Sequence, residues 1–188
     1  MPTYTEPFKL RLQKALSACL AEITPANGFV SDLSAFDPGD GVFTPRVYRG
    51  RAWFGDNDPL PMVSTLEGVD PASEVAEPPA SEPTSEYDYD LLIQGWVTDD
   101  PANPTDTAYV LLADVRQKLA AEAKRRLPHD RTEPDIFGLK AAGSSASEVT
   151  KLRFGSGVVR PADELSSTAW FWLSITVRIV ENASKPYD

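Results

Sequence analysis

The sequence predicts an α+β fold, a mostly antiparallel sheet of four to five strands with two main helices packed on it, in the order α-β-β-β-α-β-β. Two stretches place apolar residues at three- and four-residue steps, as in amphipathic helices, and several others alternate with a period of two. Hairpin-length connections favour antiparallel pairing, and the helices must cover an apolar sheet face. The length of 188 residues favours a single domain over residues 1–188.

The first helix is expected over about residues 8–23. Its apolar side chains recur every three or four residues, with lysine, arginine and glutamine between them. Thr5 is expected to cap the start of this helix, and Pro25 with Asn27-Gly28 is expected to end it.

A second helix should run from about residue 104 to residue 126. Asn103 offers a capping side chain, Pro104 suits the first helical position, and Asp106 lies near the positive end of the helix dipole. Basic residues before Pro128 suit the negative end, so this stretch has both a start signal and a stop signal.

Strands are predicted where β-branched and aromatic residues alternate with polar ones. The predicted strands are residues 42–54, 60–66, 87–97, 149–160 and 168–181. The last is the most regular, because every second residue from Ala169 to Ile179 is apolar, and one whole face of it should be buried. Residues 149–160 are a weaker candidate, since Gly155 and Gly157 interrupt them.

Charge is distributed unevenly along the chain. Residues 52–115 contain 14 acidic residues and no lysine or arginine, and the formal net charge is −10. Within this stretch, residues 68–86 combine proline, serine, alanine and glutamate with almost no large apolar side chain, so we expect a mobile acidic loop there. A second irregular segment is expected at about residues 128–147, which prolines and glycines punctuate.

Composition argues against several classes of protein. The acidic balance disfavours nucleic-acid binding through a basic surface. The single cysteine, Cys19, excludes an internal disulfide, and no stretch approaches the roughly 20 apolar residues of a membrane span. No secretory signal pattern is visible, so we expect a soluble protein that is made in the cytoplasm and has no membrane partner.

No pattern in the sequence indicates an enzyme or a cofactor. The one histidine, His129, is expected in a solvated loop, which leaves no histidine triad and no multi-histidine zinc site. Gly155-Ser156-Gly157 lacks the spacing of a nucleophile elbow, and Asp99-Asp100-Pro101 is explained by turn chemistry at a strand end.

Two acidic groups leave alternatives open. Asp37-Pro38-Gly39-Asp40-Gly41 is either a turn or a cation loop, and the turn is favoured because the alternating acids of a calcium loop are missing. Glu86, Asp88 and Asp90 share one face of a predicted strand. They form either a solvated acidic strand end, which is favoured, or a site for a divalent ion, and no metal site is predicted.

Five residues are candidates for a subunit interface. Arg46, Arg49 and Arg51 form a basic cluster, with Arg49 and Arg51 predicted on one strand face; they are either solvated or paired with an acidic neighbouring subunit. Trp170 and Trp172 start the partly polar face of the last strand, where they either join the core or pack against a subunit, because aromatic residues are enriched at interfaces.

Three stretches carry a family resemblance. They are residues 46–68 (RVYRGRAWFGDNDPLPMVSTLEG), residues 92–119 (LIQGWVTDDPANPTDTAYVLLADVRQKL) and residues 158–182 (VVRPADELSSTAWFWLSITVRIVEN). Together with the N-terminal helix they cover about two thirds of the chain, and they resemble the tail terminator, or tail completion, proteins of long-tailed bacteriophages.

The resemblance implies a structural virion protein at the head-proximal end of the tail. Such a subunit joins a homo-oligomeric, hexameric ring on the tail tube, stops tube polymerisation and presents a joining surface to the head-tail connector protein. DNA would pass through the lumen without specific binding, which an acidic lumen favours because it repels phosphates. The alternatives are another phage neck or connector protein, or an acidic DNA mimic that inhibits a nucleic-acid enzyme.

Overall fold

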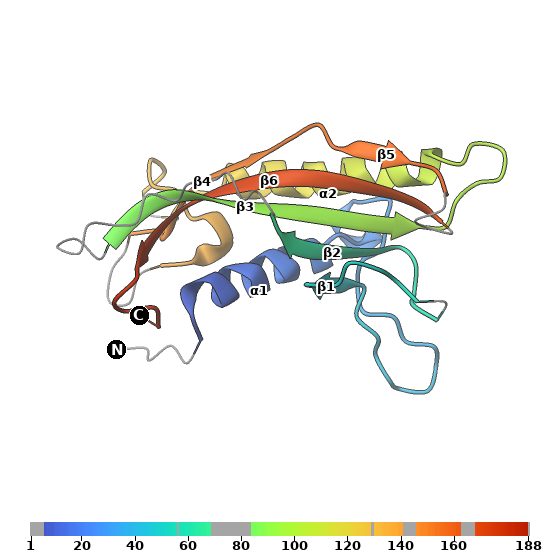
Figure 1. Cartoon of the computed structure of the whole chain (residues 1–188), viewed down its shortest axis with the longest axis horizontal. Coiled ribbons are helices and arrows are strands. Elements are labelled where there is room, and N and C mark those ends of the chain that lie inside the picture. The colour runs from blue at the N-terminus through green and yellow to red at the C-terminus, as the bar shows by residue number, and fades with distance from the viewer. Residues whose placement is uncertain are drawn as a thin grey trace.

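A computed structural model describes residues 6–55, 57–68, 84–128, 130–140, 146–162 and 168–187. It confirms the α+β class and the two main helices (Figure 1). The helices are α1 (Phe8–Ala21) and α2 (Asp106–Ala123), with the 3-10 turns η1 (Pro25–Asn27) and η2 (Ile136–Gly138). The strands are β1 (Val47–Arg49), β2 (Met62–Glu67), β3 (Thr84–Val97), β4 (Val149–Phe154), β5 (Val158–Arg160) and β6 (Ala169–Asn182).

The six strands form one mixed sheet with β6 near its centre. The strand order is β1-β2-β3-β6-β4, and β5 also pairs with β6. The two long strands β3 and β6 are antiparallel over their whole length, from Thr84 opposite Asn182 to Val97 opposite Ala169. Along its other side β6 pairs first with β5 and then with β4.

The sheet differs from the prediction in strand number and in one pairing. The predicted strand 149–160 is two strands, because the chain leaves the ladder at Gly155-Ser156-Gly157, where Gly157 has φ +77°. The predicted strand 42–54 is reduced to β1, which ends at Arg49, just before Gly50 with φ +70°. β1 runs parallel to β2, and residues 50–61 supply the long crossover that a parallel pair needs.

Both helices pack on the same face of the sheet. Every second residue of β6 from Ala169 to Ile179 is buried, as the alternation predicts. Together with the facing side chains of β3, these residues form one core with α1 and α2, so this face is the helix-covered face. The largest fully buried side chains of this core include Phe8, Leu12, Leu16, Leu91, Ile93, Leu111, Leu119 and Phe171.

The helix ends differ from the predicted ones. Pro7 occupies the N-cap of α1, and the Phe8 amide donates a hydrogen bond to the Pro186 carbonyl at 2.9 Å, while Thr5 lies outside the described residues. α2 starts at Asp106, because residues 100–105 form turns in which the Asp100 carboxylate accepts a bond from the Ala102 amide at 2.8 Å. Turn chemistry at Asp99-Asp100-Pro101 is therefore confirmed at Asp100.

Candidate interaction surface

None of the helices in the described part of the chain covers the opposite face of the sheet, and we call it the open face. It is formed by alternate side chains of β6, from Trp170 to Val180, and by their partners on β3 and β2. Large apolar residues gather at one end of this face, and charged residues gather at the other. The two ends are described in turn, because each contains residues singled out by the sequence.

The aromatic end of the open face is a second, small core. Trp96 and Met62 are fully buried, and Trp170 is 9% exposed. The ring centres of Trp170 and Trp172 are 5.1 Å apart, and the Arg160 guanidinium group lies 5.7 Å from the Trp172 ring centre. Trp170 thus packs within its own chain, and Trp172 is the half-buried member at the border of the cluster.

The charged end pairs its acids with arginines and hydroxyls. Arg178 lies 3.2 Å from the Glu86 carboxylate and 3.4 Å from that of Asp88, and Arg153 also bonds to Asp88. Thr176 donates a hydrogen bond to Asp90 at 2.7 Å. Of the three acids predicted on one strand face, Glu86 and Asp88 are therefore paired with arginines, and Asp90 is paired with a hydroxyl group. Within the described ranges no three histidine, cysteine or acidic side chains are placed to hold a metal ion.

The three arginines have different environments. Arg46 donates to the carbonyl oxygens of Asp32 at 3.2 Å and Leu60 at 3.0 Å, so it holds two loops together. Arg49 is exposed at the end of β1.

Arg51 forms an ion pair within its own chain. Its guanidinium group binds the Asp58 carboxylate, with one contact of 3.0 Å, and lies 4.6 Å from the Tyr48 ring centre. The predicted common face of Arg49 and Arg51 is wrong, because the left-handed turn at Gly50 breaks the alternation.

The segment before β1 forms a projecting arm, residues 36–44. Phe36 and Thr44 close its base with two backbone hydrogen bonds of 2.8 Å. Every residue from 35 to 43 is exposed, including the adjacent apolar pair Val42 and Phe43, which are each 64% exposed. In Figure 1 the arm is the light-blue loop that extends away from the sheet, below β1.

The arm contains the acidic motif that left two interpretations open. The Asp37 carboxylate accepts hydrogen bonds from the Gly39 amide at 2.7 Å and the Gly41 amide at 3.3 Å, and that of Asp40 accepts one from the Val42 amide at 2.9 Å. This is the turn, and the carboxylates order the backbone of the arm. Sequence reasoning missed the exposed pair because it extended the following strand back to Val42.

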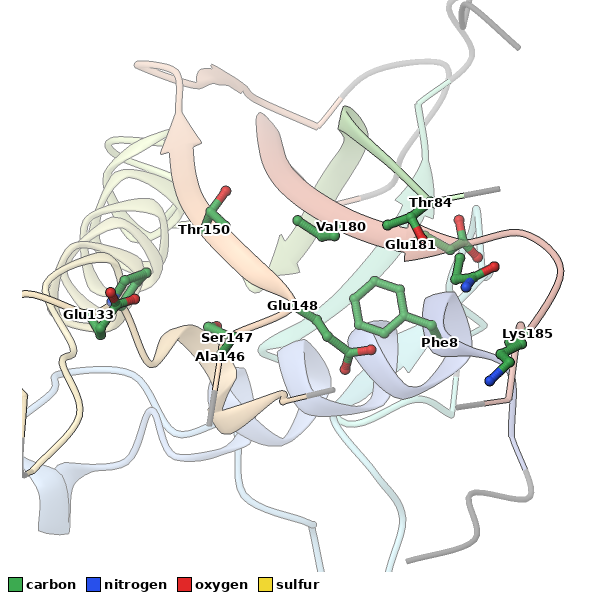
Figure 2. A pocket seen from close by; sticks show the side chains of 12 residues that line it. Phe8, Thr84, Glu133, Ala146, Ser147, Glu148, Thr150, Val180, Glu181 and Lys185 are labelled. Atoms are coloured by element: carbon green, nitrogen blue, oxygen red, sulfur yellow. The ribbon is translucent and has the colours of Figure 1, made fainter. Parts of the chain in front are cut away.

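A cavity of about 740 Å³ lies between the starts of α1 and β4 and the end of β6 (Figure 2). Its buried acid is Glu148, whose carboxylate lies 3.5 Å from the Arg11 guanidinium group. Burial raises the pKa of Glu148, and the arginine opposes that shift. The pair joins α1 to the residue just before β4, which gives it a structural role.

Several predicted features lie outside the described residues. These are His129, residues 69–83 of the acidic loop and residues 141–145 of the irregular segment.

No protein-family model matches this chain, and no curated protein matches it either. None of the helices in the described ranges is long and apolar enough to span a bilayer.

Proposed function

We propose that this protein is a structural subunit of a phage tail, which assembles into a ring at the head-proximal end of the tail tube. There it ends tube polymerisation and provides the surface that joins the head-tail connector protein. The observation that carries the proposal is the arm, which exposes Val42 and Phe43 beyond the folded body. Their adjacency on a projecting loop supports a role in protein contact, because contiguous exposed apolar surface is typical of interaction sites.

A second exposed aromatic residue supports assembly. Trp53, which follows β1, is 72% exposed, whereas the other three tryptophans are buried or half-buried. A ring closes through two different complementary patches on each subunit, and a chain with an exposed apolar arm already has one of them. The ring itself, and its six-fold symmetry, come from the family resemblance.

The charge of the chain supports a role next to DNA without DNA binding. A net charge of −10 repels phosphates, so a ring of such subunits would pass the genome without adhesion. The same charge favours the alternative, an acidic DNA mimic. Ion pairing at Glu86 and Asp88 argues against that alternative, since a mimic needs free carboxylates to bind a basic enzyme surface.

Native mass spectrometry of the purified chain and electron microscopy of virions test the proposal. We expect closed rings of one size, and antibody label at the head-proximal end of the tail. A chain that stays monomeric alone and with tail tubes, and that is absent from virions, would overturn the proposal. Tight binding to a nucleic-acid enzyme by such a monomer would favour the DNA mimic.

A further inference from the structure

We infer that the arm of one copy docks its Phe43 side chain into a pocket beside β5 of a second copy. This contact rests on the proposed function, because it is a contact between subunits of a homo-oligomer. It goes further by naming both of the patches that ring closure needs.

The receiving pocket lies between α2 and β5. It has a volume of about 340 Å³ and is lined mainly by Tyr109, Leu112, Ala113, Arg116, Val158 and Val159. Tyr109 and Val158 are themselves exposed, which adds apolar area at its rim. A cavity of about 150 Å³ is large enough for benzene, so this pocket has room for a phenylalanine ring.

The floor of the pocket depends on a glycine. A Cβ atom at Gly157 would lie 2.8 Å from Leu112 Cδ1, and the residue has φ +77°. The chain therefore passes close over α2 and leaves Val158 and Val159 beside the helix. This close approach forms a hollow with mixed polar and apolar walls, and Arg116 is the charged residue among its described lining residues.

Electrostatic complementarity favours this pocket over the apolar cavity near β2 as the binding site of the arm. The arm carries Asp37 and Asp40 beside its apolar pair, so it approaches a cation favourably and an acid unfavourably. Arg116 supplies the cation. A cavity of about 770 Å³ near β2 has a more apolar lining, but Glu67 and Asp90 line it as well, so it would repel the arm.

The positions of the two patches suit a head-to-tail contact. The arm precedes β1 at one edge of the sheet, and β5 lies at the opposite edge. Figure 1 shows the arm and β5 on opposite sides of the molecule. A single chain cannot join them, whereas a row of copies can, and repetition of such a heterologous contact closes a ring or extends a filament.

Cysteine pairing between separate chains tests the contact. Phe43→Cys protein is mixed with Val158→Cys protein and treated with a short bismaleimide. We expect cross-linked dimers in the mixture. A single chain that carries both Phe43→Cys and Val158→Cys should give a ladder of cross-linked oligomers. The native Cys19 is buried with a raised pKa, so wild-type protein treated in the same way serves as the background.

Substitutions test the energetics of the same contact. Phe43→Asp should weaken self-association by about tenfold to a hundredfold, since burying such a ring contributes roughly 1.5–3 kcal/mol. Arg116→Asp should also weaken it, and Arg116→Lys should retain it. Leu10→Asp replaces an exposed apolar residue on α1 and is the matched control, which should assemble like the parent.

The outcomes separate this contact from the proposed function. If the wild type forms rings, but the mixed cysteine proteins do not cross-link and Phe43→Asp assembles normally, the contact is wrong while the ring proposal stands. Wild-type protein that stays monomeric at its highest soluble concentration and on tail tubes would overturn both. Cross-linking within the Phe43→Cys protein alone, as strong as in the mixture, would replace the pocket by a symmetric contact of two arms.

Discussion

At the residue scale, Gly95 shows how closely the central strands pack. It lies directly opposite Phe171 in the β3–β6 register, and a Cβ atom there would lie 2.2 Å from Phe171 Cε1. The aromatic ring therefore occupies the space that any other side chain at position 95 would need. Because Phe171 is fully buried, it has little room to move away.

We expect Gly95→Ala to destabilise the fold by about 1–3 kcal/mol, the usual cost of overpacking a core. Gly55→Ala is the control, since its Cβ would meet Asp58 Oδ2 at an ordinary 3.5 Å. Urea unfolding measures both variants. Equal stability of Gly95→Ala and the parent would show that the ring moves at no cost.

Tyr89 gives the chain a defined response to alkaline pH. Burial raises the pKa of its phenol above the ordinary value of 10.0, and the nearby Glu67 carboxylate adds to the effect. Its hydroxyl group donates to Glu67 at 2.8 Å and accepts from Gln13 at 3.0 Å. Above pH 10 the unfolded chain loses this proton while the folded chain keeps it, so stability falls as the pH rises.

Tyr89→Phe should therefore make the free energy of unfolding less dependent on pH above 10. At pH 7 the same variant should be less stable by about 1 kcal/mol, because it removes two hydrogen bonds. Urea denaturation at pH 7 and pH 11 measures both effects. A variant that keeps the full alkaline slope would show that another group causes it.

At the element scale, predictability follows how strongly burial constrains a segment. The alternation in 168–181 predicted β6 nearly to the residue, because one face of this strand faces a continuous core. The strand predicted at 42–54 was mostly wrong. Its apolar residues resemble those of a buried strand, yet Val42 and Phe43 lie on the arm and only Val47–Arg49 pair.

The difference between buried strands and exposed loops also explains which features of the candidate interface residues could be predicted. Trp172, which was predicted either to join the core or to pack against a subunit, is half-buried, so its interface role stays a prediction. Parity placed Arg49 and Arg51 together, although they diverge after Gly50. A sequence pattern carries periodicity within one element. It does not predict which residue a side chain contacts across a loop, such as Asp58 for Arg51 or Leu60 for Arg46.

The connection between β2 and β3 has a minimum length. Gly68 donates a backbone hydrogen bond to Asp90, whereas β3 begins at Thr84, so the connection must reach back along β3 by roughly 20 Å at ~3.4 Å per residue. A deletion of the whole acidic segment from Asp70 to Ser85 would remove the first two residues of β3 together with the connection. A shortened link therefore needs about six or more residues.

We expect an eight-residue glycine-serine link in place of residues 69–83 to leave the melting temperature within a few degrees of the parent, since loop closure depends weakly on length. A two-residue link should unpair the start of β3 from β6. Thermal unfolding and hydrogen exchange at residues 84–88 measure the two effects. Strong destabilisation by the long link would show that the replaced acidic residues contribute packing.

At the scale of the whole molecule, substitutions of Arg49 and Arg51 distinguish effects on assembly from effects on folding. Arg49→Glu changes an exposed residue, so it should fold normally and, where a neighbouring subunit presents an acid, weaken assembly. In the Arg51→Glu variant the new carboxylate would face the like charge of Asp58. We expect this variant to be less stable by about 1–3 kcal/mol. Light scattering and thermal unfolding measure the two variants. Normal assembly of Arg49→Glu would remove Arg49 from the interface.

The position of β6 in the sheet has a consequence for synthesis on the ribosome. β3, β4 and β5 do not pair with one another; each pairs with β6, which is the last of the described strands to be translated. Until residues 169–182 leave the exit tunnel, the nascent chain therefore holds three strands with unpaired edges, and such edges template aggregation. Stalled chains that end before Ala169 should consequently recruit chaperones more strongly than full-length ones.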